Sequence, residues 1–211
     1  EGESPEGAAD TDQADGEAPR SRSGAYALGA TEWRDVDAAI SYALRRGAER
    51  VVLMGWSMGG AVALQTALNS GNRERVAGLI LESPVVDWRT VLRFQAKIAG
   101  MRAPLPDLAM GALSVPLTAR LSGADDAISF DRLDIVARAG ELDLPILILH
   151  SEDDGFVPAD ASHALRDARP DIVTMPRFSV ARHTKLWNYD QMGWSSAITD
   201  WLREQGFSAS A

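Results

Sequence analysis

A serine stands at the centre of a G-x-S-x-G pattern, in the stretch Gly55-Trp56-Ser57-Met58-Gly59-Gly60. The apolar run 51–54 precedes it and the small, mostly apolar run 61–69 follows it, which predicts a sharp turn between a buried strand and a helix. Small residues two before and two after a serine on such a turn avoid clashes between neighbouring backbone segments. The pattern predicts that Ser57 is a nucleophile; the alternative is a glycine-rich turn with an incidental serine.

The residue after the serine, Met58, would lie at the start of the following helix. Its backbone N–H is expected to point toward an oxyanion that develops on a substrate, where the helix dipole favours negative charge. Met58 is therefore the expected oxyanion-hole donor.

A serine hydroxyl is a poor nucleophile without a base, and the chain has three histidines, His150, His163 and His183. His150 ends an apolar strand and is expected to be buried and hydrogen-bonded. His163 lies within a predicted helix beside charged residues and is expected to be solvated. His183 lies in a polar loop after the last predicted strand, with the freedom to reach Ser57, so we expect it to be the general base.

A carboxylate must orient such a histidine and stabilise its protonated form. Asp153 and Asp154 lie in the loop after the predicted strand 146–149, on the edge of a parallel sheet where functional groups gather. Both fit chemically, and either could instead be a turn carboxylate or a helix N-terminal acid. Asp87, after the predicted strand 79–81, is a weaker third candidate.

Apolar strands alternate with helices along the rest of the chain. The expected strands are 51–54, 79–81, 146–149 and, more weakly, 172–175; the expected helices are about 32–46, 61–69, 159–168 and 193–205. Thr31 is the expected N-cap of the first helix and Gly47 its end. Strands that are apolar throughout and separated by helices indicate an α/β fold with a parallel, doubly wound sheet covered on both faces. Residues 88–140 fit the alternation poorly and are predicted to be an inserted helical cap.

The 211 residues carry a formal charge of −9, but seven of the acids fall in residues 1–19, which hold no base. That segment lacks large apolar residues, so we expect residues 1–23 to be a disordered acidic tail and 24–211 the folded domain. The acidic balance argues against a nucleic-acid partner. The absence of cysteine excludes disulfides, thiolate metal sites and cysteine nucleophiles.

The stretch from Val51 to Asn72 has no charged residue, but its glycines and polar side chains favour a strand, a turn and a helix over a membrane span. The acidic N-terminal segment also lacks the basic start and apolar run of a signal peptide. The sequence therefore indicates a cytoplasmic protein with no membrane partner.

The order Ser57, Asp154, His183 resembles the Ser–Asp–His order of the α/β-hydrolase superfamily. Residues 55–60 resemble its nucleophile elbow. Residues 150–158 resemble the H-G-x-x-D-x-x-V-P stretch that carries the acid, with Ser151 where glycine is usual, and this alignment selects Asp154 over Asp153. Residues 183–188 are similar to the histidine loop of bacterial serine hydrolases related to the prolyl oligopeptidase and serine aminopeptidase groups. The resemblance extends from about residue 24 to 205.

This resemblance implies a serine hydrolase that forms an acyl-enzyme on a small ester, thioester or peptide substrate and needs no metal or organic cofactor. A carboxylesterase is the first expectation, because the predicted cap is apolar and no charged subsite is evident. A serine peptidase is the second. A catalytically inactive fragment or binding module is the alternative, and an acyltransferase or cofactor-free haloperoxidase using the same residues is also compatible with the motifs.

The chain departs from the family pattern before the elbow. Complete members carry several strands and a glycine-containing loop there, whereas this chain has one predicted helix and the acidic tail. The resemblance therefore implies an N-terminally incomplete hydrolase domain without the usual second oxyanion donor. The far edge of the elbow strand would be unpaired, a place where another chain could associate.

Overall fold

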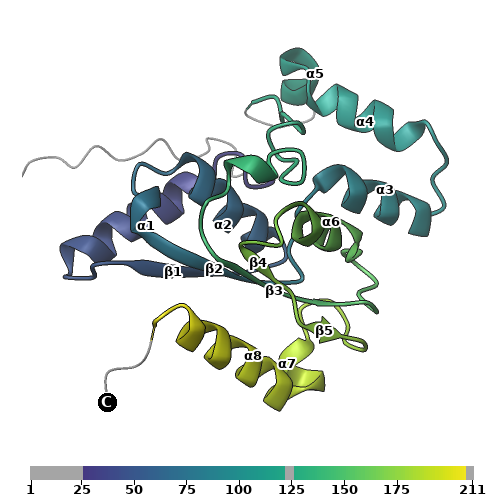
Figure 1. Cartoon of the computed structure of the whole chain (residues 1–211). Coiled ribbons are helices and arrows are strands. Elements are labelled where there is room, and N and C mark those ends of the chain that lie inside the picture. The colour runs from purple at the N-terminus through teal and green to yellow at the C-terminus, as the bar shows by residue number, and fades with distance from the viewer. Residues whose placement is uncertain (1–25, 122–125, 208–211) are drawn as a thin grey trace, which may run out of the picture.

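The computed structural model describes residues 26–121 and 126–207 (Figure 1). The predicted tail, 1–23, lies outside the described residues. In chain order the elements are α1 (Trp33–Arg45), β1 (Val51–Trp56), α2 (Met58–Asn69), η1 (Arg73–Arg75), β2 (Val76–Glu82), α3 (Trp88–Ile98), α4 (Leu105–Leu113), α5 (Pro116–Leu121), η2 (Ala139–Glu141), β3 (Ile146–Ser151), α6 (Asp160–Ala168), β4 (Val173–Thr174), β5 (Arg177–Phe178), α7 (Leu186–Tyr189) and α8 (Gln191–Glu204), where η marks a short 3-10 helix.

The strands form one parallel sheet in the order β1-β2-β3-β4, and β5 pairs with β3. Glu82, the last residue of β2, lies opposite Trp56 of β1 and Leu149 of β3. The carboxyl ends of β1, β2 and β3 therefore meet along one edge of the sheet. The predicted parallel α/β architecture is confirmed.

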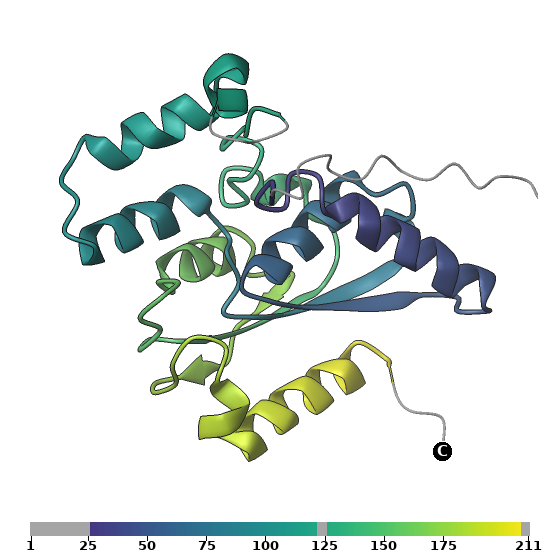
Figure 2. The ribbon, with the colours of Figure 1, turned by 180° about the vertical axis from the view of Figure 1, so that it is seen from behind.

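Helices cover both faces of the sheet. α1, α2 and α6 lie on one face and α8 on the other, as both views show (Figures 1 and 2). Alternate residues of the strands pack into the two resulting cores: Leu79 and Leu81 contact the α1–α2–α6 side, whereas Ile80 contacts the α8 side. This two-sided burial explains why the strands are apolar at every position rather than at every second one.

The start of α1 differs from the sequence prediction. Glu32 rather than Thr31 occupies the N-cap position, and no side chain caps the helix from there. The Glu32 carboxylate instead accepts hydrogen bonds from the backbone N–H groups of Gly29 (2.9 Å) and Thr31 (3.2 Å). These N–H groups belong to the turn before the helix, so the Glu32 side chain fixes that turn and does not cap the first turn of α1.

Other elements also differ from the sequence prediction. α2 begins at Met58, directly after the serine, and not at Ala61. The weak strand predicted at 172–175 is reduced to the two residues of β4, and β5 and the four-residue helix α7 were not predicted. β4, β5 and α7 are too short to produce a hydrophobic period in the sequence.

The segment between β2 and β3 contains α3, α4 and α5, with α4 and α5 farthest from the sheet in both views (Figures 1 and 2). It carries several exposed apolar side chains: Ile98, Met101, Leu105, Leu108, Val115 and Leu117. These helices fall inside the segment 88–140, whose role as a cap stays a prediction. No helix within residues 26–121 and 126–207 is long and apolar enough to cross a membrane.

Candidate active site

Ser57 occupies a strained turn between β1 and α2. Its φ of 53° and ψ of −119° lie where side-chain-bearing residues are rarely found. The surrounding backbone fixes this conformation: the Ser57 N–H donates to the carbonyl of Glu82 (3.0 Å), and the Ser57 carbonyl accepts from Gly60 (3.0 Å) and Val85 (3.1 Å). The predicted sharp strand-to-helix turn is confirmed.

Two glycines make the turn sterically feasible. A Cβ on Gly55 would lie 2.5 Å from the carbonyl oxygen of Gly59, and a Cβ on Gly60 would lie 2.6 Å from Cβ of Pro84. A Cβ on Gly59 would meet nothing within 4 Å. The expectation for Gly55 is therefore confirmed. The expectation that Gly59 avoids a clash is wrong, because the tight contact on that side falls at Gly60.

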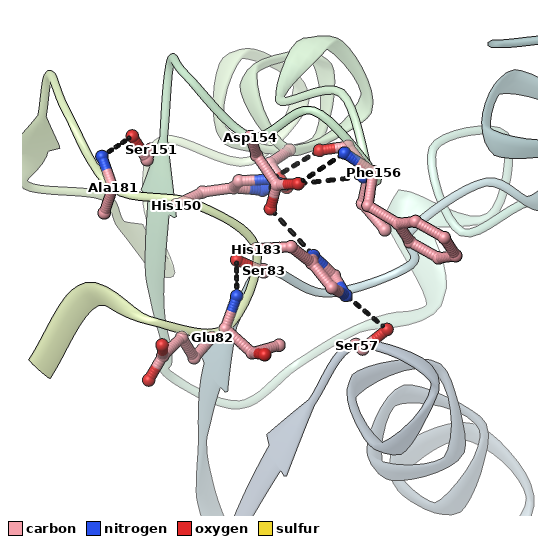
Figure 3. Close-up of polar contacts among 12 residues, drawn as sticks. Ser57, Glu82, Ser83, His150, Ser151, Asp154, Phe156, Ala181 and His183 are labelled. Atoms are coloured by element: carbon pink, nitrogen blue, oxygen red, sulfur yellow. Dashed lines mark hydrogen bonds and ion pairs between the residues drawn. The ribbon is translucent and has the colours of Figure 1, made fainter. Parts of the chain in front are cut away.

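Three side chains from separate loops form a hydrogen-bonded series at the carboxyl edge of the sheet (Figure 3). His183 Nε2 lies 2.9 Å from Ser57 Oγ, and His183 Nδ1 lies 2.9 Å from Asp154 Oδ2. A carboxylate can only accept, so Nδ1 carries the proton and Nε2 is left to accept from the serine hydroxyl. In this arrangement the imidazole can withdraw a proton from Ser57 while the carboxylate stabilises the resulting charge.

Asp154 is held in its ionised form by its surroundings. The residue is 5% exposed, and its Oδ1 accepts the backbone N–H groups of Phe156 and Val157, each at 2.9 Å. His150 Nε2 also lies 3.4 Å from Oδ2. Burial alone would raise the pKa of Asp154, but the hydrogen bonds from His150, His183 and the two backbone N–H groups outweigh it and hold that pKa well below its usual range.

The other histidines lie outside this series. His150 is buried between the hydroxyl of Ser162, 2.8 Å from Nδ1, and the carbonyl of Val157, 3.0 Å from Nε2, as expected. His163 was expected to be solvated, but its side chain is only 29% exposed and its Nε2 lies 2.9 Å from Oε1 of Glu152. This contact holds the imidazole against the loop after β3 and leaves it only partly exposed to solvent.

The two other candidate acids have different roles. Asp153 is exposed, and its backbone N–H donates to Ser151 Oγ at 3.1 Å. Asp87 is the N-cap of α3, where its carboxylate accepts the N–H groups of Arg89 and Thr90. Within the described part of the chain, no cluster of three or more His, Asp or Glu side chains could hold a metal ion.

Comparisons with known proteins bear on this geometry. The family model described as serine aminopeptidase, S33, matches residues 24–128. The solved structure of an esterase from Pyrococcus furiosus superimposes with a TM-score of 0.58 at 16% identity, over 84% of this chain and 62% of that one. The chain belongs to the α/β-hydrolase superfamily.

Further structures have the same hydrolase fold. A monoacylglycerol lipase from Paleococcus ferrophilus gives a TM-score of 0.53 at 20% identity, over 82% of this chain and 76% of that one. An acylaminoacyl peptidase from Pyrococcus horikoshii gives 0.61 at 17% identity, over 84% of this chain and 28% of that one. The sequence matches no curated protein. The predicted superfamily is confirmed, and the expectation of a hydrolase-class enzyme agrees with it.

The predicted oxyanion donor of this α/β-hydrolase is Met58, the first residue of α2. The first N–H groups of a helix have no acceptor within the helix, so the Met58 N–H is oriented to donate beyond it. It lies directly after Ser57, at the positive end of the helix dipole.

Two contacts at the hydrolase site were not expected from the sequence. The fully buried hydroxyl of Ser151 accepts the N–H of Ala181 at 2.8 Å and so joins the loop that carries Asp154 to the loop that carries His183 (Figure 3). The ring of Phe156 lies with its centroid 5.0 Å from that of His183. The only sequence signal was Ser151 itself, a hydroxyl where the family pattern has glycine.

Proposed function

We propose that this α/β-hydrolase is a serine hydrolase that cleaves small carboxylic esters through an acyl-enzyme. The observation that carries the proposal is the hydrogen-bonded series from Ser57 Oγ through His183 to Asp154, with both links at 2.9 Å and the serine on a strained turn. An activated serine nucleophile requires a base in hydrogen-bond reach and a group that orients the base.

The proposed reaction begins with attack of Ser57 Oγ on the ester carbonyl carbon, while His183 Nε2 takes the hydroxyl proton. The oxyanion that forms is stabilised by the Met58 N–H. His183 then gives its proton to the leaving alcohol oxygen as the C–O bond breaks, which leaves the acyl group on Ser57. A water molecule repeats the sequence: it attacks the acyl carbon, gives a proton to His183, and the acid leaves as Ser57 Oγ regains its proton. Asp154 stays ionised throughout.

An apolar side chain at the site favours esters. Phe156, half exposed beside the imidazole, offers a contact for a hydrocarbon acyl or alcohol group. The similarity to an esterase and to a monoacylglycerol lipase supports the same choice. The similarity to an acylaminoacyl peptidase makes peptide cleavage the second candidate.

The test compares the purified protein with Ser57→Ala on p-nitrophenyl butyrate and on a peptide p-nitroanilide. Ser196→Ala, which changes an exposed serine on α8, is the matched control. We expect ester hydrolysis in the wild type and the control, and none above background in Ser57→Ala. Equal rates in wild type and Ser57→Ala would refute the assignment, and faster cleavage of the anilide than of the ester would favour the peptidase.

Labelling with a fluorophosphonate provides a second readout, because the reagent modifies only an activated serine. Mass spectrometry of the labelled protein is expected to find the adduct on Ser57. A folded protein that neither hydrolyses the ester nor takes up the label would be an inactive member of the superfamily.

A further inference from the structure

A buried carboxylate lies beside the proposed catalytic residues without contacting any of them through its side chain. Glu82, the last residue of β2, is 2% exposed. Its Oε1 accepts the backbone N–H of Leu186 at 3.1 Å. Its Oε2 accepts two indole N–H groups, from Trp56 at 3.0 Å and from Trp194 at 2.9 Å. All three donors are neutral.

Two of these donors adjoin the proposed catalytic residues in sequence. Trp56 immediately precedes Ser57, and Leu186 begins α7, directly after the loop that carries His183. Trp194 belongs to α8. The Glu82 side chain therefore connects the turn of the nucleophile to the end of the histidine loop.

The backbone around Glu82 makes the same two connections. The Glu82 carbonyl accepts the N–H of Ser57 at 3.0 Å. The next side chain, Ser83, is fully buried, and its hydroxyl accepts the N–H of Thr184 at 3.3 Å (Figure 3). Thr184 has a φ of 52° and directly follows His183, so the histidine loop is held in an unusual conformation at this contact.

A buried carboxylate is costly unless hydrogen bonds replace its hydration, and apolar replacements of buried charges are often no less stable. A single carboxylate can, however, accept several N–H groups from different directions, which an apolar side chain cannot do. The hydrogen bonds from Trp56 and Leu186 thus fix, relative to Glu82, two segments that are 26 and 104 residues away from it in sequence.

We infer that Glu82 is a positioning residue: it holds the turn of Ser57 and the loop of His183 so that Oγ and Nε2 stay at hydrogen-bond distance. This inference rests on the proposed function of Ser57 as the nucleophile. It concerns a residue that touches neither substrate nor reacting atoms and that acts through its neighbours.

The decisive variant is Glu82→Gln, because an amide presents one acceptor oxygen and one NH2 group, and the NH2 would face N–H donors. A displacement of about 1 Å between reacting groups can cost about 100-fold in rate. We expect kcat for p-nitrophenyl butyrate and the rate of fluorophosphonate labelling each to fall by about 10- to 100-fold, with KM changed by less than about threefold. Glu141→Gln, at an exposed carboxylate paired with Arg138, is the matched control and should match the wild type.

Two tryptophan variants separate positioning from stability. Trp56→Phe and Trp194→Phe each remove one indole N–H from the same carboxylate oxygen, but only Trp56 adjoins the nucleophile. We expect Trp56→Phe to slow labelling by about three- to tenfold and Trp194→Phe to leave it within about twofold of wild type, even where both lower the unfolding midpoint. This pair decides the question if Glu82→Gln does not fold.

Each outcome is distinguishable. A wild type that is not labelled on Ser57 refutes the proposed function and, with it, the inference. A wild type that is labelled, with Glu82→Gln reacting at the same rate, overturns the positioning role alone. Equal effects of Trp56→Phe and Trp194→Phe on labelling would also overturn it, because a purely structural carboxylate would make the two donors equivalent.

Discussion

His183 Nδ1 lies 2.9 Å from Oδ2 of Asp154. This hydrogen bond joins two loops, and the two bonded residues are 29 positions apart in sequence. It determines which imidazole nitrogen faces Ser57. It also places an ionised carboxylate where positive charge would develop on the imidazole.

Asp154→Asn tests this contact directly. The amide of asparagine can present its NH2 group to His183 Nδ1, which favours the tautomer whose proton is on Nε2. A protonated Nε2 cannot accept the hydrogen bond from the Ser57 hydroxyl. We expect kcat to fall by about 10⁴-fold, as in other serine triads, with the fold retained. Ester hydrolysis measures the effect, and Asp153→Asn, at the exposed neighbouring carboxylate, is expected to keep wild-type activity. Comparable losses in both variants would contradict a specific role for Asp154.

The depressed pKa of Asp154 predicts how stability depends on pH. The ordinary pKa of this group is 3.8, and the folded protein holds it lower. Ionisation of Asp154 therefore stabilises the fold above pH 3.8, and this contribution is lost as the pH falls further, because the unfolded chain then binds a proton that the folded chain does not.

Urea denaturation of wild type and Asp154→Asn between pH 3 and pH 7, in steps of about one pH unit, tests this direction of the pKa shift. The quantity compared is the free energy of unfolding of the two proteins at each pH. We expect the difference between them to be constant near neutral pH and to shrink below the ordinary pKa, with a limiting slope of about 1.4 kcal/mol per pH unit. A difference in unfolding free energy that grows as the pH falls would show that folding raises the pKa of Asp154.

The glycines of the elbow differ in what they tolerate. Gly55→Ala would place a Cβ 2.5 Å from a backbone oxygen that cannot move without distorting α2, whereas Gly59→Ala places a Cβ in open space. We expect Gly55→Ala to cost about 1–3 kcal/mol or more in unfolding free energy. Gly59→Ala is expected to be neutral or to stabilise by up to about 1 kcal/mol, because alanine favours helix. Urea unfolding of both variants gives the comparison, and equal destabilisation would argue against this packing.

Ser151→Ala tests the bond between the acid loop and the histidine loop. The variant leaves the buried N–H of Ala181 without its acceptor. We expect the free energy of unfolding to fall by about 1–3 kcal/mol. We also expect slower labelling of Ser57, since the loop of His183 loses an anchor. Thermal unfolding and labelling are the two measurements, with Ser196→Ala as the exposed serine control. A variant as stable and as reactive as the wild type would contradict the anchoring role.

Local patterns predicted the architecture, Ser57 and His183, whereas the choice of Asp154 over Asp153 came from the resemblance to the α/β-hydrolase superfamily. The strand-turn-helix pattern around Ser57 is contiguous in sequence, and the chain offered only three histidines. The structure places the three predicted side chains within hydrogen-bond distance; their chemical roles stay predictions.

Contacts between distant segments could not be predicted in this way. Glu82 ends an apolar strand and gave no sign of its contact with Trp194, 112 residues later. Thr31 had the residue type of an N-cap, but Glu32 occupies that position without a capping hydrogen bond, and its carboxylate accepts N–H groups of the preceding turn. Gly59 fitted the motif, although the close packing falls one residue later, where Pro84 approaches. Packing between distant segments decided the positions of Glu82 and Gly60.

Within the described part of the chain, β1 pairs with one strand only, β2. Successive backbone N–H groups of a strand point to opposite sides, so alternate amides of β1 are held in the ladder while the others lie along its open side. Amide hydrogen exchange should therefore divide β1 into two interleaved sets, one slow and one fast. The strand that leads to Ser57 would then be firmly anchored along one side and open to isotope exchange along the other.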